Sequence, residues 1–380
     1  MAKSAVLEHQ RGGIPAATQG QMIEREYGWI RIGGHAALER QKGRNGLDVY
    51  HVSLKEAQAD PRLVALGGGS PFERLDWLAM LADACLDADK TRVSVACDGT
   101  RVAALPWQIG DAGVEALANW YNFFVRPLGD PALLAEIART LPLGRALLAP
   151  LPQADATALA AAMRRAGWIV LAQPCDANHF LPVRGRSFAE YWAGRPGALR
   201  ETVRRKSRKG EVTLRIADTF SCADWNAYEA IYRLSWKPGE GSPAFLRQWA
   251  QAEGAAGRLR LGMAEIAGQP VAAQFWTVEG STAFIHKLAH DERFRKQSPG
   301  TLLTAALFAH VIDTDRVAEV DFGTGDDPYK RDWMEEVRQR WQLRAWRPGA
   351  VRHWPSLARA LAGSVRTLRR QPLVSPVRVA

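Results

Sequence analysis

Several features that would point to a particular class of protein are missing from this sequence. The 380 residues hold only four cysteines, far apart and without a Cys-x-x-Cys pair, so neither a disulfide framework nor a structural zinc site is expected. No apolar run reaches the roughly 18 residues that a membrane-spanning helix needs. Residues 1–20 contain no apolar core of a secretory signal, and the cytoplasm is the expected compartment.

Acidic residues are missing from the last part of the chain. From Val337 to Ala380 there are ten arginines and no lysine, aspartate or glutamate, while the remaining residues carry 40 basic and 40 acidic side chains. The net charge of +10 therefore belongs to the C-terminus, and the rest of the chain is neutral. A neutral body without a recognisable nucleic-acid module gives no reason to expect a nucleic-acid partner.

Residues 1–45 lack sustained hydrophobic periodicity and are rich in Gly, Gln and Arg, so we predict a flexible arm there. Alternating apolar residues predict that ordered structure begins with a strand over 47–52. A helix is predicted over 71–86. That prediction depends on the apolar spacing of Leu75, Leu78, Ala82 and Leu86.

A segment of the sequence recurs 169 residues further on. Residues 99–107 (GTRVAALPW) align without gaps on residues 268–276 (GQPVAAQFW), and the same offset places Arg126 on Arg295. One offset that persists over about 35 residues indicates an internal duplication. Each copy predicts a β-hairpin, a further strand, a loop, a helix and another strand. In the second copy these are the strands 259–266, 270–278, 282–289 and 318–322, the loop 293–300 and the helix 301–313.

Two such copies predict an α+β protein of two tandem lobes, with mixed twisted sheets flanked by helices. The predicted division is the arm over 1–45, a first lobe over 46–180, a second lobe over 181–350 and a tail over 351–380. Polar residues suited to chemistry are concentrated in the second copy: where it has Asp321, the offset lands on Pro152. We therefore expect the active site in the second lobe, with the degenerate first lobe as a wall of the substrate groove.

The segment from Arg293 to Thr301 predicts a loop followed by a helix. The first N–H groups of a helix have no partner within it and the helix dipole is positive there, so such a turn suits a phosphate. Gly300 would let the backbone approach the phosphate, and Ser298 is expected to cap the helix. The residues predicted to bind a pyrophosphate-bearing cofactor are Arg295, Lys296, Ser298, Pro299, Gly300 and Thr301. An ordinary capped helix with solvated basic residues is the alternative.

Two motifs carry a resemblance to a known family: SPGTLL at 298–303 and DFGTGDDPYKRDW at 321–333, with Ser235-Trp236-Lys237 as a further element. Over roughly residues 65–345 the chain resembles the GNAT superfamily, and within it the CelD-like acyltransferases of cellulose biosynthesis, which are related to the Fem peptidyl transferases. The usual GNAT pyrophosphate loop, Arg/Gln-x-x-Gly-x-Gly/Ala, is matched only by Gly300 and the basic residues before it.

The resemblance implies acyl-CoA as the donor substrate and an amine as the acceptor. Attack on a thioester needs a base for the amine proton, donors for the oxyanion and an acid for the leaving thiolate. The candidate catalytic residues are His286, Asp321, Tyr329 and Lys330. Each has a structural alternative: His286 as a core histidine, Asp321 as a cap of the turn 323–325, and Tyr329 and Lys330 as anchors of the next helix.

The acceptor site is predicted to involve residues close to these candidates. They are Trp236, Lys237, Trp276, Asp326 and Asp327, with core packing as the alternative for the two tryptophans. Three carboxylates in this region could suggest a metal, but the Pro-Tyr-Lys sequence that follows adds a positive charge. We therefore expect no metal.

Two basic segments are predicted to be helical. Residues 200–209 could grip CoA phosphates, a lipid headgroup or RNA, although such runs are usually solvated surfaces. At 100° per residue, residues 352–370 separate an apolar face from an arginine face, with Pro355 in the first turn. A basic amphipathic helix predicts contact with an anionic membrane, here the inner face of the plasma membrane. Docking on the body of the protein is the alternative.

These observations predict a cytoplasmic N-acyltransferase that moves an acyl group from acyl-CoA to a primary amine. The acceptor could be a lipid amine such as a sphingoid base, which would give a ceramide-type product, or an amino sugar of an exopolysaccharide pathway. A Fem-like transferase that uses aminoacyl-tRNA and a non-catalytic membrane-associated scaffold are the alternatives.

Overall fold

The computed structural model describes residues 41–42 and 47–370 of the chain, which belong to one compact unit. The predicted arm lies outside these residues except for strand β1 (Gln41–Lys42). The last ten residues of the predicted tail lie outside them as well.

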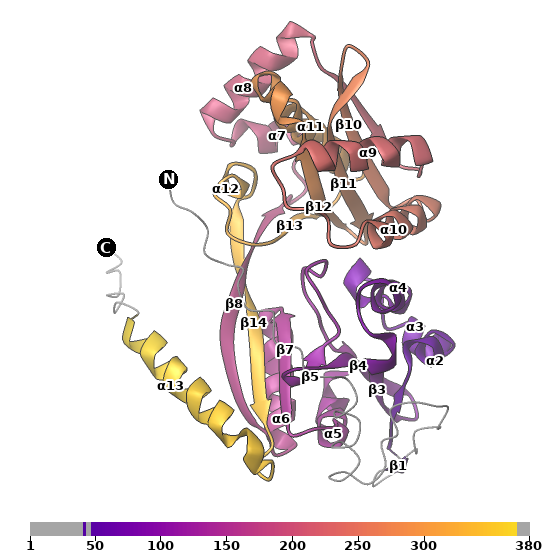
Figure 1. Ribbon diagram of the computed structural model, residues 1–380, viewed down its shortest axis with the longest axis vertical. Coiled ribbons are helices and arrows are strands. Elements are labelled where there is room, and N and C mark those ends of the chain that lie inside the picture. The colour runs from indigo at the N-terminus through magenta and orange to yellow at the C-terminus, as the bar shows by residue number, and fades with distance from the viewer. Residues whose placement is uncertain (1–40, 43–46, 371–380) are drawn as a thin grey trace. The chain divides into compact units, whose positions relative to one another are not determined.

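The first half of the described chain alternates short helices with strands (Figure 1). Its elements are β2 (Asp48–Val52), α2 (Leu54–Gln58), α3 (Pro61–Val64), η2 (Pro71–Glu73), α4 (Leu75–Cys85), η3 (Ala88–Lys90), β3 (Thr91–Asp98), β4 (Arg101–Gly110), β5 (Gly113–Ala116), β6 (Leu128–Gly129), η4 (Pro131–Leu133), α5 (Leu134–Thr140), β7 (Arg145–Leu151), α6 (Gln153–Arg165) and β8 (Ile169–Pro182).

The second half repeats this order after two additional helices and ends in a long helix. Its elements are α7 (Phe188–Ala193), α8 (Gly197–Lys209), β9 (Thr213–Ala217), α9 (Cys222–Leu234), α10 (Pro243–Ala255), β10 (Leu259–Ile266), β11 (Gln269–Glu279), β12 (Thr282–His290), η5 (Glu292–Gln297), α11 (Pro299–Ala309), the π-helical turn η6 (His310–Thr314), β13 (Glu319–Thr324), α12 (Lys330–Trp333), β14 (Glu336–Trp346), η7 (Val351–His353) and α13 (Trp354–Arg370).

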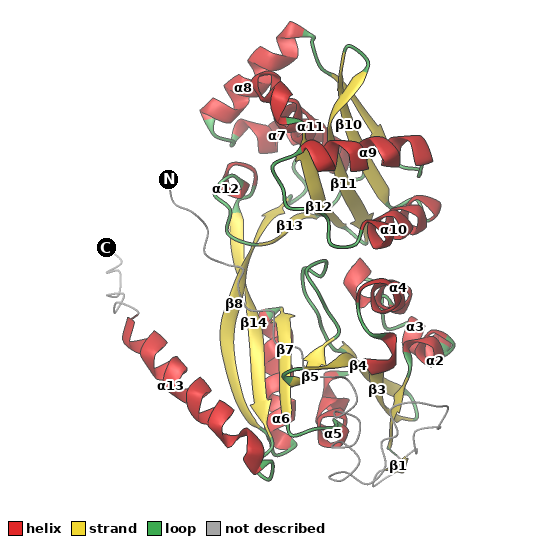
Figure 2. Cartoon of the chain, in the orientation of Figure 1, coloured by secondary structure: helices red, strands yellow, loops and turns green. Residues whose placement is uncertain are grey.

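The predicted duplication is present in the strand order. Adding 169 to β3, β4 and β5 gives 260–267, 270–279 and 282–285, which lie on β10, β11 and β12. In each half these three strands form an antiparallel meander, and the third strand then pairs in parallel with the strand that follows the next helices, β5 with β7 and β12 with β13. We call residues 47–168 the first lobe and residues 183–335 the second lobe. The α+β prediction of two lobes is confirmed (Figure 2).

Strands β8 and β14 join the two lobes by a reciprocal exchange. β8 follows the first lobe in the chain but pairs with β13 of the second, and β14 follows the second lobe but pairs with β7 of the first. The two strands also pair with each other along the whole of β14. The described strands therefore form one mixed sheet of 14 strands that runs through both lobes (Figure 1). The predicted lobe limit at residue 180 falls inside β8, and β14 lies beside a strand of the first lobe.

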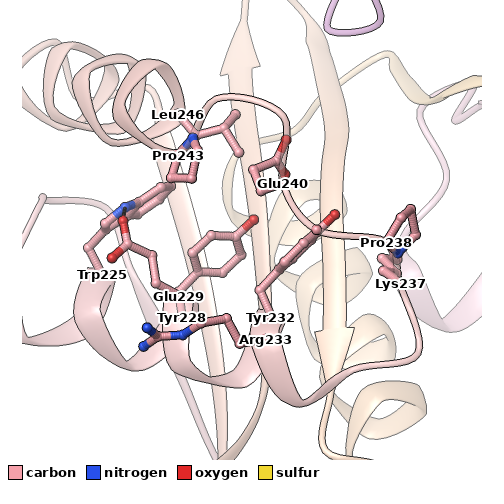
Figure 3. Close-up of a pocket in the computed structure, with 11 residues that line it drawn as sticks. Trp225, Tyr228, Glu229, Tyr232, Arg233, Lys237, Pro238, Glu240, Pro243 and Leu246 are labelled. Atoms are coloured by element: carbon pink, nitrogen blue, oxygen red, sulfur yellow. Dashed lines mark hydrogen bonds between the residues drawn. The ribbon is translucent and has the colours of Figure 1, made fainter.

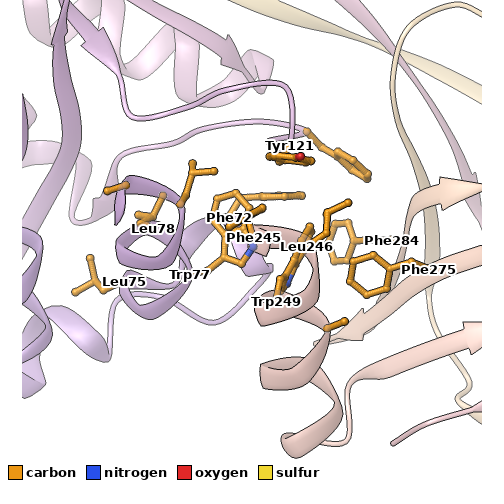
Figure 4. Close-up of a cluster of buried hydrophobic side chains, with 14 of the residues drawn as sticks. Phe72, Leu75, Trp77, Leu78, Tyr121, Phe245, Leu246, Trp249, Phe275 and Phe284 are labelled. Atoms are coloured by element: carbon orange, nitrogen blue, oxygen red, sulfur yellow. The ribbon is translucent and has the colours of Figure 1, made fainter. Parts of the chain in front are cut away.

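A hydrophobic core is shared between the lobes. Phe72 and Trp77 of the first lobe pack against Phe245 and Trp249 of α10 in the second, with Trp77 and Trp249 ring centroids 5.4 Å apart (Figure 4). The helix predicted over 71–86 begins later, at Leu75, because Arg74 has an extended backbone after the 3₁₀ turn η2. Its apolar positions face this core as the spacing predicts, since Leu75, Leu78 and Ala82 are buried.

Helix α11 packs against the sheet of the second lobe. Leu303, Leu307 and Phe308 are fully buried in a core cluster that lines one face of the sheet. The helix predicted over 301–313 is confirmed, although it starts at Pro299 and its last turn, His310–Thr314, is π-helical.

The helix predicted in the basic tail is α13, with Pro355 in its first turn. Its start is tied to the body, because the indole N–H of Trp346 donates to Ser356 Oγ at 2.8 Å. Trp354 and Leu361 remain 56% and 45% exposed. Within the described residues, no helix combines the length and apolarity that crossing a membrane requires.

Candidate active site

Strands β12 and β13 separate in the second lobe. They pair in parallel only from Thr282 to Phe284, opposite Glu319 to Asp321, and no further pairing between them is present in the described residues. On its other side β13 pairs with β8 at Glu319–Asp321 and again at Thr324. The unpaired edges of the two strands therefore line an opening into which an extended chain with amide groups could add as a further strand.

A β-bulge lies on β12 where the opening begins. Lys287 pairs with Phe275 and Ile285 with Trp276, so His286 is the extra residue and has no partner on β11. A bulge bends its strand and redirects the side chains beside it. In this bulge His286 lies against Trp249, and Lys287 forms an ion pair with Glu240.

The N-terminus of α11 faces this opening without a side-chain cap. Ser298 adopts a left-handed backbone with φ of 56°, and its side chain makes no capping bond, contrary to the prediction. Pro299 has no N–H, and within the described residues the N–H groups of Gly300 and Thr301 make no hydrogen bond outside the helix. Gly300 has no structural need to be glycine, because its φ is not positive and an added Cβ would come no closer than 3.6 Å to His290. The vacant face of Gly300 therefore suits the approach of a ligand.

Basic residues surround this helix end. Arg295 and Lys296 are exposed on η5, and Lys206 of α8 donates from Nζ to the carbonyl oxygen of Lys296. The predicted phosphate site is therefore extended by one residue of the basic helix 200–209. Pro299 is buried and contributes to the backbone turn rather than to a ligand surface.

The corresponding turn of the first lobe is closed by its own carboxylate. Asp130 caps η4 by accepting a hydrogen bond from the N–H of Ala132 at 2.8 Å, and Pro131 is the first residue of η4 as Pro299 is of α11. Asp130 also lies 3.7 Å from Arg101. A fixed negative charge at this helix end disfavours a phosphate there, in contrast to the uncapped N-terminus of α11.

Trp276 was predicted to line the acceptor site, but it is fully buried in the core. Its indole N–H donates to Gln274 Oε1 at 3.0 Å, and Gln274 in turn donates to the carbonyl oxygen of Gly300 at 3.1 Å. The structural alternative is therefore correct for Trp276. Through Gln274 it fixes the first turn of α11.

His286 lies in an aromatic cage rather than in an open cleft. Trp249, Phe275 and Phe123 surround its ring at centroid distances of 4.3, 5.2 and 5.2 Å. Nε2 lies 2.8 Å from Thr277 Oγ1, whereas Nδ1 is buried and has no partner among the described residues. Burial, reinforced by the charge of Lys287, lowers the pKa of His286 well below its usual value. The ring is neutral and enclosed, as expected of a core histidine and not of a base that exchanges protons with a substrate.

Asp321 is fully buried and both of its oxygens are engaged. Oδ1 accepts from Asn178 and from the N–H of Gly323, both at 2.7 Å. Oδ2 accepts from Arg338 at 2.7 Å and from Arg340 at 3.4 Å. Both oxygens of this carboxylate already have partners, two of them guanidinium groups, which favours the structural alternative over a catalytic role for Asp321. It orders the turn 323–325, as the structural alternative stated.

Lys330 has a similar ordering role. It is 3% exposed, and its Nζ donates to the carbonyl oxygens of Thr324 and Gly325, the latter at 3.1 Å. Burial lowers the pKa of Lys330. The ammonium group is committed to the glycine turn and is not free to bind a phosphate.

Tyr329 keeps the properties that an acid needs. Its side chain is 47% exposed and lies edge-on to Phe322 of β13, at a centroid distance of 5.6 Å. Partial burial of the side chain and the negative charge of Asp327 raise the pKa of Tyr329 to about 12. The hydroxyl is therefore protonated at neutral pH and able to donate a proton at the end of β13.

The two aspartates after the glycine turn are exposed, as an acceptor surface requires. Asp326 lies 2.8 Å from Nε2 of the buried His179 and accepts from Arg331 at 3.0 Å. Asp327 is 59% exposed and lies 3.7 Å from Lys330 Nζ. Within the described residues, no group of three His, Cys, Asp or Glu side chains is placed to hold a metal ion.

Lys237 is the titratable group whose surroundings best fit a general base. Burial lowers its pKa to about 8, and the charges of Lys287 and Lys330 contribute to the shift. Its ammonium group lies 5.7 Å from the ring centroid of the exposed Trp236. Because Asp327 and Lys330 act on it electrostatically, Lys237 lies near the end of β13 and the opening.

The first lobe contributes residues that the sequence did not identify. Tyr121 Oη donates to Glu240 at 2.6 Å, and Glu240 forms an ion pair with Lys287 at 2.8 Å. Phe123 lies against His286 and against Gly323, where an added Cβ would meet the Phe123 ring at 2.9 Å. The aromatic run Trp120 to Phe124 was the available signal, but nothing in the sequence placed it next to residues more than 100 positions further on, since Tyr121 and Glu240 are 119 positions apart.

The comparisons with known proteins agree with this geometry. Residues 197–331 match the family model described as an acetyltransferase (GNAT) domain. That range contains α8, the bulged strand, the opening and α11, and the predicted GNAT resemblance is confirmed for it. No curated protein matches the chain significantly in sequence.

Solved structures share the two-lobe fold. FemX is 10% identical with a TM-score of 0.55, and the match covers 78% of this chain and 96% of that chain. The C-terminal domain of a putative lysylphosphatidylglycerol synthetase from Agrobacterium fabrum is 14% identical with a TM-score of 0.54, covering 80% and 95%. A conserved protein of unknown function from Bacteroides thetaiotaomicron is 12% identical with a TM-score of 0.53, covering 78% and 98%. The likeness is one of fold, and together with the domain match it indicates a GNAT-type transferase.

Proposed function

We propose that this chain is an N-acyltransferase that binds acyl-CoA between β12 and β13 of the second lobe and transfers the acyl group to a primary amine. The observation that carries the proposal is the opening between the two strands, which ends beside the uncapped N-terminus of α11. The first lobe has the same strands but closes its helix end with Asp130.

The residues around the opening fit the chemical groups of such a donor. The N–H groups of Gly300 and Thr301, with Arg295, Lys296 and Lys206, suit a pyrophosphate. The unpaired edges of β12 and β13 suit the amide groups of an extended arm. The thioester would then lie near the bulge at His286.

In the proposed reaction a bond forms between the amine nitrogen and the acyl carbon as the carbon–sulfur bond breaks. Lys237 in its neutral form takes the proton from the attacking amine, and Tyr329 gives a proton to the leaving thiolate. These roles follow from a pKa of about 8 for Lys237 and a pKa of about 12 for Tyr329. Asp326, Asp327 and Trp236 would contact the acceptor.

We also propose that the acceptor is a lipid amine met at a membrane surface. The support is the segment of η7 and α13, which exposes Trp354 and Leu361 on one face and carries Arg352 and Arg359 on the other. An amino sugar of an exopolysaccharide is the alternative acceptor.

A second candidate function is transfer from aminoacyl-tRNA, as in a Fem-like enzyme. It is favoured by the fold likeness to FemX and by the basic helix α8, which lies next to the candidate phosphate site. RNA binding by α8 would then replace the binding of CoA by α11.

The decisive experiment is calorimetric titration of the full chain with CoA and with transfer RNA, in wild type and in two matched variants. Gly300→Val fills the vacant face at the second position of α11. Ala132→Val places the same side chain at the exposed second position of η4. We expect CoA binding to weaken at least tenfold in Gly300→Val and to stay unchanged in Ala132→Val. Tight binding of transfer RNA without binding of CoA would overturn the proposal in favour of the second candidate.

A further inference from the structure

A cavity of about 280 Å³ lies in the second lobe between α9 and the segment 237–243 (Figure 3). Its walls are mostly apolar, and the aromatic rings come from one face of α9. The residues that define it are Trp225, Tyr228, Tyr232, Pro243 and Leu246.

The two acidic side chains at the cavity already have partners. Glu229 accepts from the indole N–H of Trp225 at 2.9 Å and from Arg247 at 2.8 Å. Glu240 is paired with Lys287 and Tyr121. The cavity therefore presents no free carboxylate to a ligand, and its two cations are Arg233, which is exposed, and Lys237, the proposed base. Its mostly apolar walls would not replace the water around a sugar or a nucleotide.

One polar atom in the cavity is without a partner. Tyr228 is 2% exposed, and its hydroxyl makes no hydrogen bond with any described residue. Its ring packs on Trp225 at a centroid distance of 4.6 Å, and Figure 3 shows the hydroxyl directed toward the segment that carries Glu240. A buried hydroxyl without a partner is costly, so this atom marks the point of the cavity that favours a polar group of a ligand, such as a carbonyl oxygen, whereas the other walls favour an apolar chain.

The cavity borders the strand on which the acyl group is expected. Its wall residue Glu240 is bonded to Lys287, which directly follows His286 in the bulge of β12. Lys237, the proposed base, lines the same cavity. A chain that extends from a thioester at the bulge would therefore enter this cavity.

We infer that this cavity binds the acyl chain of the donor, and that the donor carries a medium-length acyl group rather than acetyl. This inference rests on the proposed function. If each non-hydrogen atom takes about 30 Å³, as a water molecule does in the liquid, 280 Å³ accommodates about nine of them. An acetyl group would leave most of the cavity empty, whereas a chain of about eight to ten carbons fills it.

The experiment measures the affinity of the full chain for CoA and for a series of its S-alkyl thioethers, which bind but cannot transfer. Each methylene that enters the cavity should tighten the Kd by about fourfold. We expect this gain to continue to a chain of about eight to ten carbons and then to stop. An affinity that does not change with chain length, while CoA itself binds, overturns the inference and leaves the proposed function standing.

A matched pair of variants tests the location. Gly239 lines the cavity and Gly349 does not, and at both positions an added Cβ meets nothing within 4 Å and φ is not positive. Gly239→Phe should abolish the gain with chain length while binding of CoA stays within twofold, and Gly349→Phe should behave as wild type. An unchanged chain-length series in Gly239→Phe would overturn the assignment to this cavity.

A series of free alkylamines, octylamine to dodecylamine, separates the donor chain from an apolar acceptor. A chain-length gain for the amines that Gly239→Phe removes, without one for the thioethers, would overturn the inference in favour of an acceptor pocket. Failure of CoA and of all its thioethers to bind would contradict the inference and the proposed function together.

Discussion

At the scale of single residues, the structure reassigns the chemistry within the predicted site. The residues that looked catalytic because of their type and position, His286 and Asp321, are enclosed by aromatic rings and by two arginines. Lys237, predicted only to contact the acceptor, is the group with the most suitable pKa. Burial decides these roles, since it disfavours charge on a lysine and leaves a neutral amine available near physiological pH.

The first prediction concerns the pH dependence of turnover. Because the pKa of Lys237 is lowered to about 8, kcat/KM should rise about tenfold per pH unit below pH 8 and level off above it. Replacing Lys237 with methionine should lower kcat by at least about 100-fold. The measurement is a pH–rate profile for release of the CoA thiol.

The control for this profile is Lys287→Met. The variant removes the positive charge of Lys287, which lowers the pKa of Lys237. It also leaves the carboxylate of Glu240 unpaired, and the negative charge of Glu240 raises the pKa of Lys237. Both changes act in the same direction, so the midpoint should move to higher pH. A profile that keeps its midpoint in this variant would exclude Lys237 as the titrating base.

The second prediction separates an ordering role of Asp321 from a catalytic one. Asp321→Asn should destabilise the folded protein by about 3–5 kcal/mol, because Arg338 and Arg340 lose their buried counter-charge. The matched change Asp326→Asn, at a side chain that is 54% exposed, should alter the free energy of unfolding by less than about 1 kcal/mol. Urea unfolding at pH 7 gives both values, and similar values for the two variants would refute the ordering role.

At the scale of elements, the two helix ends related by the duplication show how one unit can gain or lose a binding function. The N-terminus before α5 is capped by Asp130, whereas the N-terminus of α11 carries no cap. A single carboxylate therefore distinguishes a closed helix end in the first lobe from the open one that we propose binds the donor. The strands, turns and helices around it are otherwise in the same order.

The third prediction concerns α13 and the membrane. The full chain should bind vesicles that contain anionic lipid and release them at high salt, since each arginine near such a surface contributes up to about 1 kcal/mol. Removing residues 351–380 should abolish binding, and vesicles of neutral lipid should not bind either chain. Co-sedimentation measures this, and equal binding by the shortened chain would show that α13 docks elsewhere.

At the scale of the whole described unit, the strand exchange makes the lobes depend on each other. β14 is the last strand in the chain, yet it lies between β7 and β8 in the middle of the sheet. The core around Phe72, Trp77 and Trp249 also crosses from one lobe to the other. We therefore expect one cooperative unfolding transition instead of one for each lobe.

The fourth prediction tests this dependence by truncation. A chain that ends at residue 335 lacks β14 and leaves β7 and β8 without their shared neighbour, so it should not fold cooperatively. A chain that ends at residue 350 keeps β14 and should unfold in a single transition close to that of the full chain. Near-ultraviolet circular dichroism during thermal unfolding distinguishes the two, and a cooperative transition in the shorter chain would contradict the proposed dependence.

Much of the fold was predictable from the sequence, because it depends on local patterns. Alternation, glycine turns and helical spacing predicted the strands 259–266 and 282–289 and the helix 301–313 within a few residues of their observed limits. The duplication at 169 residues predicted two lobes, and the family-model match lies in the second copy, where the sequence placed the active site. Charge counting located the basic tail.

The tertiary structure alone decided which polar residues are free to act and where the lobes exchange strands. Pairing of β14 with β7 joins residues nearly 200 positions apart, and no local pattern encodes such a pairing. The enclosure of Asp321 and His286, the exposure of Tyr329 and the lowered pKa of Lys237 all depend on neighbours from distant segments. Sequence spacing could bring these residues to one region, but burial and charge, which set their chemistry, exist only once the chain is folded.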